Sequence, residues 1–281
     1  MDTPNKQQYI AQLLQSDSPF FIGRIAGVEL QTAYNFVNDN LNQVERNLLE
    51  LSNNAGIYVT SNESLLTYVD KLIASYMHCT VIAEWDETGP VFAITGKGQR
   101  FIQIRTPTIP KINARELEPY YYKESWMSAM KGKRVLIIHP FIHTMQNQLH
   151  HLSVLFTGRN WFEDCTITFF KPPVTLAGHH MKRDWREHYE TSIRELQLHT
   201  DFDVALVAAG GYGMLLSDYI FTHMGKSVMY IGGALQLFFG VIGKRWFDNK
   251  EIMDLMNDNW VRPNKNDKPE NFVSVEKGCY W

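Results

Sequence analysis

The sequence predicts an α/β protein with a Rossmann-like, mostly parallel sheet flanked by helices. Three short apolar runs, rich in β-branched residues, support this fold class and cover 135–139, 203–209 and 227–231. Continuous apolar runs are typical of strands covered on both faces, as in parallel sheets. Segments of helical length separate the runs, and parallel strands need such crossovers. We therefore expect a single α/β domain over residues 1–281.

The remaining elements follow from local patterns along the chain. Strands are predicted over 20–25 and 165–170, with a short strand over 101–104 in a region, 79–120, that glycine and proline otherwise break into loops. Helical periodicity predicts helices over 30–51, 62–75, 184–198 and 213–223. Residues 262–281 are expected to form a surface loop and a C-terminal tail.

Charge and cysteine content argue against several classes of function. The chain has 27 Lys+Arg against 30 Asp+Glu, a formal net charge of -3, which gives no field to attract nucleic acid. Its three cysteines lack metal-ligand spacing, which favours a reducing compartment. The sequence has no signal pattern and no apolar run of about 18 residues. We therefore expect a soluble, cytoplasmic protein with no membrane span.

Ligands of open α/β sheets bind beyond the carboxyl ends of the strands, so the residues after each predicted strand are site candidates. The first such segment contains Arg24 and Glu29, two charged residues in an apolar, glycine-containing run. Charges in such surroundings are costly unless they pair or face a ligand. Arg24 and Glu29 are therefore candidate functional residues, with an internal ion pair as the alternative.

Two glycine-rich turns follow the strands over 203–209 and 227–231. Small residues let backbone N–H groups approach an anion, so both turns are candidate phosphate sites, with tight packing as the alternative. Beyond the second turn, a cationic pair is suited to a pyrophosphate, with a solvated basic pair as the alternative. A glutamine amide there could contact a base or sugar edge. The candidates are Gly210, Gly211, Tyr212, Gly213, Gly232, Gly233, Gln236, Lys244 and Arg245.

The strand over 135–139 ends in a histidine, His139, which is followed by proline. A histidine at this position is a candidate general base or hydrogen-bond donor, and a buried, satisfied histidine is the alternative. The pairs His150-His151 and His179-His180 are assigned no metal, because adjacent side chains diverge on regular structure.

Taken together and in this order, the four segments resemble the GT-D-type glycosyltransferases, α/β sugar transferases whose N-terminal signature reads approximately R-x-G-D-G-E. Arg24-Ile-Ala-Gly-Val-Glu29 is similar to that signature. The resemblance covers roughly residues 19–246 and includes His139-Pro-Phe, the turn at 210–213 and Ile231-Gly232. It implies that these segments converge on one cleft.

The resemblance also implies a reaction, in which a sugar passes from a nucleotide-sugar donor to a hydroxyl of a carbohydrate or glycoconjugate acceptor. Glu29 and His139 are then the candidate bases, and Arg24 and Gly27 join the donor-binding residues. The family's divalent metal, Mn²⁺ or Mg²⁺, is in doubt here. Gly27 occupies the aspartate position of the signature, so Glu29 is the one matching ligand. Cations such as Arg245 could replace the metal's charge on the diphosphate.

Two other classes of function remain open from the sequence. A non-catalytic nucleotide- or carbohydrate-binding protein would be consistent with the missing aspartate. Another Rossmann-like nucleotide enzyme, such as a methyltransferase, would place its ligand at the same strand ends. The turn at 210–213 does not extend to the G-x-G-x-x-G dinucleotide fingerprint, and no P-loop lysine follows it.

Overall fold

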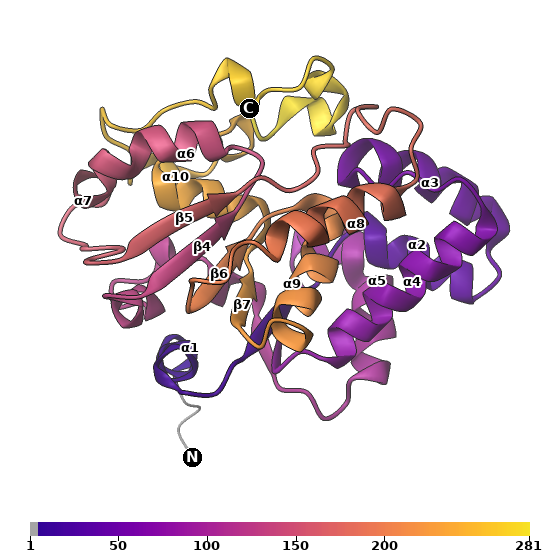
Figure 1. Ribbon diagram of the computed structural model, residues 1–281, viewed down its shortest axis with the longest axis horizontal. Coiled ribbons are helices and arrows are strands. Elements are labelled where there is room, and N and C mark those ends of the chain that lie inside the picture. Colours follow the sequence, from indigo (N-terminus) through magenta and orange to yellow (C-terminus); the bar gives the residue numbers. More distant parts are fainter. Residues whose placement is uncertain (1–4) are drawn as a thin grey trace.

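A seven-stranded, all-parallel sheet organises residues 5–281, the part of the chain that the computed structural model describes (Figure 1). The strands lie in the order β3-β2-β1-β7-β6-β4-β5. They are β1 (Phe21–Arg24), β2 (Val81–Glu84), β3 (Lys111–Asn113), β4 (Arg134–Ile138), β5 (Thr166–Phe170), β6 (Val204–Val207) and β7 (Ser227–Tyr230). The predicted fold class is therefore confirmed.

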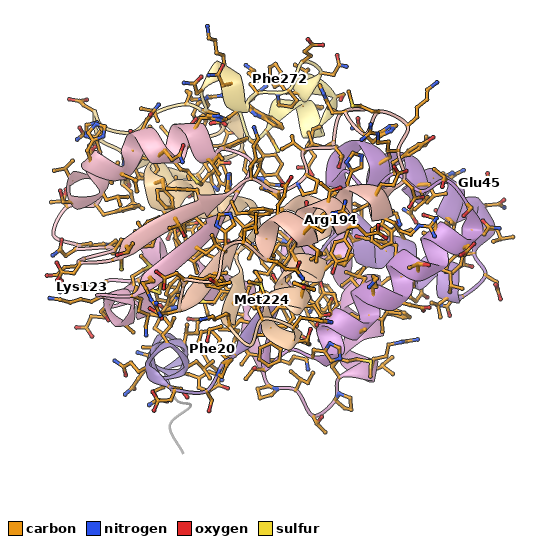
Figure 2. All side chains as sticks on the ribbon, viewed as in Figure 1. Phe20, Glu45, Lys123, Arg194, Met224 and Phe272 are labelled. Atoms are coloured by element: carbon orange, nitrogen blue, oxygen red, sulfur yellow. The ribbon has the colours of Figure 1, made fainter. Side chains whose placement is uncertain are left out.

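Both faces of the sheet are covered by helices. In β6, Val204 and Leu206 contribute to one apolar layer, and Ala205 and Val207 to the other. The first layer contains α1 (Lys6–Gln15), α6 (Ile142–Gln148), α7 (Leu152–Leu155) and α10 (Lys250–Met253). The second contains α2 (Val28–Val37), α3 (Leu41–Ala55), α4 (Asn62–Met77), α5 (Pro90–Arg105), α8 (Trp185–Leu196) and α9 (Gly213–Thr222). Side chains fill the space between sheet and helices (Figure 2).

Most predicted elements are present, and two predictions were wrong. Residues 101–104 are not a strand, because they lie in α5, where Phe101 and Ile102 are buried and Ile104 is 77% exposed. The predicted helix over 30–51 is two helices, α2 and α3. The chain turns between them at Asp39, whose φ of 53° lies in the left-handed region. A left-handed residue cannot continue an α-helix, so the segment divides there.

The C-terminal segment, residues 262–281, is more deeply packed than a surface loop. It contains only 3-10 turns, yet Asp267, Val275 and Trp281 are buried (yellow in Figure 1). The Asp267 carboxylate accepts hydrogen bonds from the backbone N–H and the hydroxyl of Thr144 in α6, at 2.7 and 2.6 Å. The indole of Trp281 donates to the Asp267 carbonyl at 3.1 Å.

The connections that leave neighbouring strands diverge at the carboxyl edge of the sheet. Those after β1 and β6 lead to α2 and α9 in one layer, and those after β4 and β7 lead to α6 and to η6 (Gly232–Phe239) in the other. Such divergence opens a crevice at the strand ends. No helix in residues 5–281 is both long and apolar enough to cross a membrane.

Candidate functional site

A cavity of about 680 Å³ lies over the carboxyl ends of β1, β7, β6 and β4. Its size is in the range of small-molecule sites. The predicted site residues that line it are Arg24, Gly27, Glu29, His139, Gly210, Gly232, Gly233, Gln236 and Arg245. The structure therefore brings together segments that are more than two hundred residues apart. Gly211, Tyr212, Gly213 and Lys244 do not line the cavity.

Arg24 is the last residue of β1, and its guanidinium is held on three sides. It donates to the Glu118 carboxylate at 3.0 Å and to the Ile231 carbonyl, and it lies 4.4 Å from the centre of the Trp85 ring. The side chains of Arg24 and Glu118 are 10% and 13% exposed. The internal ion pair that the sequence suggested thus exists, but its carboxylate is Glu118 and not Glu29.

Glu29 lies in the first turn of α2 and is 8% exposed. No cation within residues 5–281 forms an ion pair with it. Burial raises the pKa of Glu29, backbone N–H groups at the helix start offset part of that rise, and the nearby Glu276 carboxylate adds to it. Glu29 is therefore a buried carboxyl that faces the cavity with an increased affinity for a proton.

His139 follows β4 and is 2% exposed. Its Nδ1 atom accepts a hydrogen bond from the Phe141 backbone N–H at 2.9 Å. Because that N–H can only donate, the proton of the neutral ring is on Nε2. Burial lowers the pKa of His139 to about 3, so the ring is neutral at pH 7. This arrangement makes His139 a hydrogen-bond donor and leaves Glu29 as the stronger candidate base.

The turn at 210–213 is shaped mainly by packing. A Cβ atom on Gly211 would lie 2.3 Å from Ile57, and one on Gly213 would lie 2.2 Å from the ring of Tyr230. The Tyr212 ring is buried, and its hydroxyl donates to the Gly56 carbonyl at 3.3 Å. The packing alternative accounts for these residues, because no side chain larger than hydrogen fits at either glycine.

The segment after β7 has two roles. Gly232 has a φ of 71°, and a Cβ there would lie 3.5 Å from the Arg24 guanidinium. Gln236 is fully buried, and its amide donates to the Val241 and Tyr280 carbonyls at 3.0 and 3.2 Å, while its Oε1 has no partner within residues 5–281. Part of this segment therefore faces the cavity, and part holds the C-terminal segment.

Arg245 and Lys244 differ although they are adjacent. The Arg245 guanidinium lines the cavity and donates to the Tyr280 hydroxyl and to the Glu276 carboxylate, both at 3.2 Å. Both residues are exposed, but Lys244 lies outside the lining. The solvated-surface alternative accounts for Lys244, whereas Arg245 is partly exposed but paired at the cavity.

Several lining residues were not predicted as site residues from the sequence. They are Trp85, Glu118, Asp267, Glu276, Tyr280 and Trp281. The sequence carries a signal for Tyr280 and Trp281, because an aromatic pair after a polar stretch can anchor that stretch on a hydrophobic core. Glu118 and Glu276 carry no such signal.

The cavity is lined by more acidic than basic side chains. The carboxylates of Glu29, Glu50, Glu118, Asp267 and Glu276 line it, against the guanidiniums of Arg24 and Arg245. Within residues 5–281, no group of three or more His, Cys, Asp or Glu side chains is placed to hold a metal ion. With Gly27 in the aspartate position, this donor set does not fit a divalent cation held by the protein alone.

No protein-family model matches the chain, and neither a curated protein nor a solved structure is similar enough to count as a match. We therefore infer function from the residues of the cavity.

Proposed function

We propose that this protein transfers a sugar from a nucleotide-diphosphate donor to a hydroxyl acceptor. The main support is the convergence of the segments around Arg24, His139, Gly210 and Gly232 on one cavity that also contains the buried carboxyl of Glu29. These are the segments that resemble glycosyltransferases of the GT-D type. Their common location is what a shared donor site would require.

The chemistry needs a base for the acceptor hydroxyl and positive charge for the departing diphosphate. Glu29 is our candidate base, since a raised pKa brings its proton affinity closer to that of a group working at neutral pH. His139 Nε2–H is a candidate donor to a sugar or phosphate oxygen. Arg24 and Arg245 are the candidate contacts for the diphosphate, because guanidinium matches phosphate geometry.

The aromatic lining offers a second kind of contact. Trp85, Tyr230, Trp246 and Tyr280 line the cavity, and aromatic faces stack on sugar rings and nucleobases. Arg24 lies 4.4 Å from the centre of the Trp85 ring and Arg245 lies 4.8 Å from the centre of the Tyr280 ring, so a guanidinium already covers one face of each.

A thermal-shift panel of nucleotide sugars, followed by a hydrolysis assay on each hit, tests the proposal. A donor that binds the folded state raises the melting temperature, by an amount that grows with its concentration over Kd. We expect one class of nucleotide sugar to do so and to be slowly hydrolysed. If neither nucleotide sugars nor nucleoside diphosphates shift the melting temperature, the proposal is wrong.

A non-catalytic carbohydrate-binding protein is the second candidate, and the acidic balance of the cavity favours it. Five lining carboxylates against two paired guanidiniums suit a neutral ligand better than a polyanion. This candidate predicts that free oligosaccharides raise the melting temperature and that nucleotide sugars raise it no further.

A further inference from the structure

The positively charged group best placed for a diphosphate, Arg245, already holds a carboxylate. Its guanidinium donates to Glu276 Oε2 at 3.2 Å, and the two side chains are 41% and 42% exposed. Both residues line the cavity. The other cavity guanidinium, Arg24, is held by Glu118 in a far more buried pair. An entering anion therefore meets one arginine whose partner is accessible and one whose partner is not.

Residues 279–281, which follow Glu276, pack closely against the segment after β7. A Cβ on Gly233 would lie 2.5 Å from the Tyr280 ring, and one on Gly243 would lie 2.5 Å from the Tyr280 carbonyl oxygen. The Arg245 backbone N–H donates to the Cys279 carbonyl at 2.8 Å. Part of the glycine content after β7 thus serves to receive residues 279–281 and not a phosphate.

The backbone conformation and the charged surroundings of Glu276 are unfavourable. Glu276 and Lys277 have φ of 45° and 59°, in the left-handed region, which a residue with a Cβ rarely adopts. Glu276 also lies near Glu29, with which it shares no cation. The Cys279 thiol also donates to Glu276 Oε2 at 3.2 Å, a weak hydrogen bond, and like-charge repulsion favours movement of this side chain once another anion binds Arg245.

We propose that Glu276 is an internal substitute for the donor diphosphate, and that a nucleoside diphosphate binds by displacing the Glu276 carboxylate from Arg245. This inference rests on the proposed function. It makes Glu276 a specificity-determining residue, because only a ligand with an anion strong enough to replace a carboxylate gains the Arg245 contact. A neutral sugar does not, so the cavity selects the nucleotide-linked sugar over the free one.

Calorimetric titration with UDP, GDP and inorganic pyrophosphate tests this exchange. Glu276→Gln removes the competing charge and keeps the side-chain shape, so we expect binding roughly two- to fivefold tighter than to the unaltered protein, the size of a half-exposed ion pair. Arg245→Ala should weaken binding roughly tenfold. In the double variant the gain from Glu276→Gln should disappear. If Glu276→Gln tightens the binding of UDP and GDP but not of pyrophosphate, the exchange still occurs and the nucleobase is also needed for it.

Glu270→Gln is the matched control, because it removes the same charge from an exposed position of the same segment. We expect it to bind like the unaltered protein. Equal or weaker binding by Glu276→Gln, with UDP or GDP still bound by the unaltered protein, would overturn the inference and leave the proposed function standing. Absence of binding to every variant would overturn both.

Hydrogen exchange on the unaltered protein gives a second test that needs no variant. If the diphosphate displaces Glu276, amides of residues 275–281 should exchange faster in the complex, while those around Arg24 exchange more slowly. Slower exchange of residues 275–281 in the complex would mean that the segment closes over the ligand, contrary to the inference.

Discussion

Asp184 and Glu29 are both buried carboxylates at the start of a helix, and they differ in what surrounds them. Asp184, the N-cap of α8, accepts hydrogen bonds from the Ser64 hydroxyl at 2.5 Å, from the Thr60 backbone and hydroxyl at 3.1 and 2.7 Å, and from Arg186. Although burial by itself raises its pKa, these hydrogen bonds lower the pKa of Asp184 to about 2. Burial instead raises the pKa of Glu29, because the backbone N–H groups at the start of α2 offset only part of that rise.

The contrast separates a structural carboxylate from a candidate functional one. Oδ2 of Asp184 accepts hydrogen bonds from Thr60 and Ser64 at the start of α4, and Oδ1 accepts from Arg186 in α8, so its charge stabilises the fold. Glu29 forms no ion pair within residues 5–281 and lines the cavity, so its charge is available to a ligand. Burial alone does not distinguish the two, since both are less than a tenth exposed.

The largest effect that we expect is on folding, from Asp184→Asn. The amide removes the charge and points an N–H group at donors, so the free energy of unfolding should fall by roughly 3 kcal/mol. Urea denaturation monitored by tryptophan fluorescence measures this. A change below about 0.5 kcal/mol, the usual effect of a surface substitution, would mean that Asp184 is not a structural carboxylate.

The next effect is on turnover, from Glu29→Gln. If Glu29 is the base, the variant should transfer sugar roughly 10²-fold more slowly, which corresponds to about 2.7 kcal/mol. Its stability should not fall. A carboxyl whose folded-state pKa is raised stabilises the protein most at low pH, and that contribution is lost as pH rises through the folded pKa. Glutamine removes this penalty at neutral pH.

Thermal melting of Glu29→Gln at pH 7 therefore distinguishes the two roles. An unchanged or higher melting temperature together with a slow transfer rate supports a functional carboxyl. A lower melting temperature would place Glu29 with Asp184 as a structural group, and full activity would exclude it as the base.

The smallest effect concerns His139, which shares the cavity with Glu29. Its folded pKa of about 3 lies below the ordinary 6.5, so between these values the unfolded chain binds a proton that the folded chain does not. Stability should therefore fall with falling pH, by about 1.4 kcal/mol per unit from this residue. In urea denaturation between pH 6 and pH 4.5, His139→Gln should show a slope shallower by that amount. An unchanged slope would mean that the ring is solvated.

The central strands could be predicted from the sequence because they are buried on both faces. The runs at 135–139, 203–209 and 227–231 became β4, β6 and β7, which lie next to one another in the sheet. Helix α5 could not be predicted from the sequence, because Gly96 and Gly98 lower the local helix propensity. A Cβ on Gly98 would lie 2.7 Å from Leu30, so the glycine allows α5 to pack closely against α2. Such a contact is invisible in one segment alone.

The site was predictable where it is made of strand ends. Arg24 ends β1, and Glu29 and His139 follow strands of the same parallel sheet, so all three lie at its carboxyl edge. Glu118 and Glu276 lie in segments without long regular elements, whose paths are set by tertiary contacts. Periodicity carries no information about those paths, so the partners of both arginines could not be predicted.

The pairing of β1 with β7 has a consequence for synthesis of the chain. Phe21 of β1 pairs with Val228 of β7, so about 200 residues must be translated after β1 before this neighbour exists. At the usual rate of 5–20 residues per second, this takes roughly 10–40 s. During that time one edge of a strand that is buried in the folded protein has no partner within the sheet, which makes it prone to pairing with other chains. The nascent protein is therefore expected to depend on ribosome-associated chaperones until β7 has emerged.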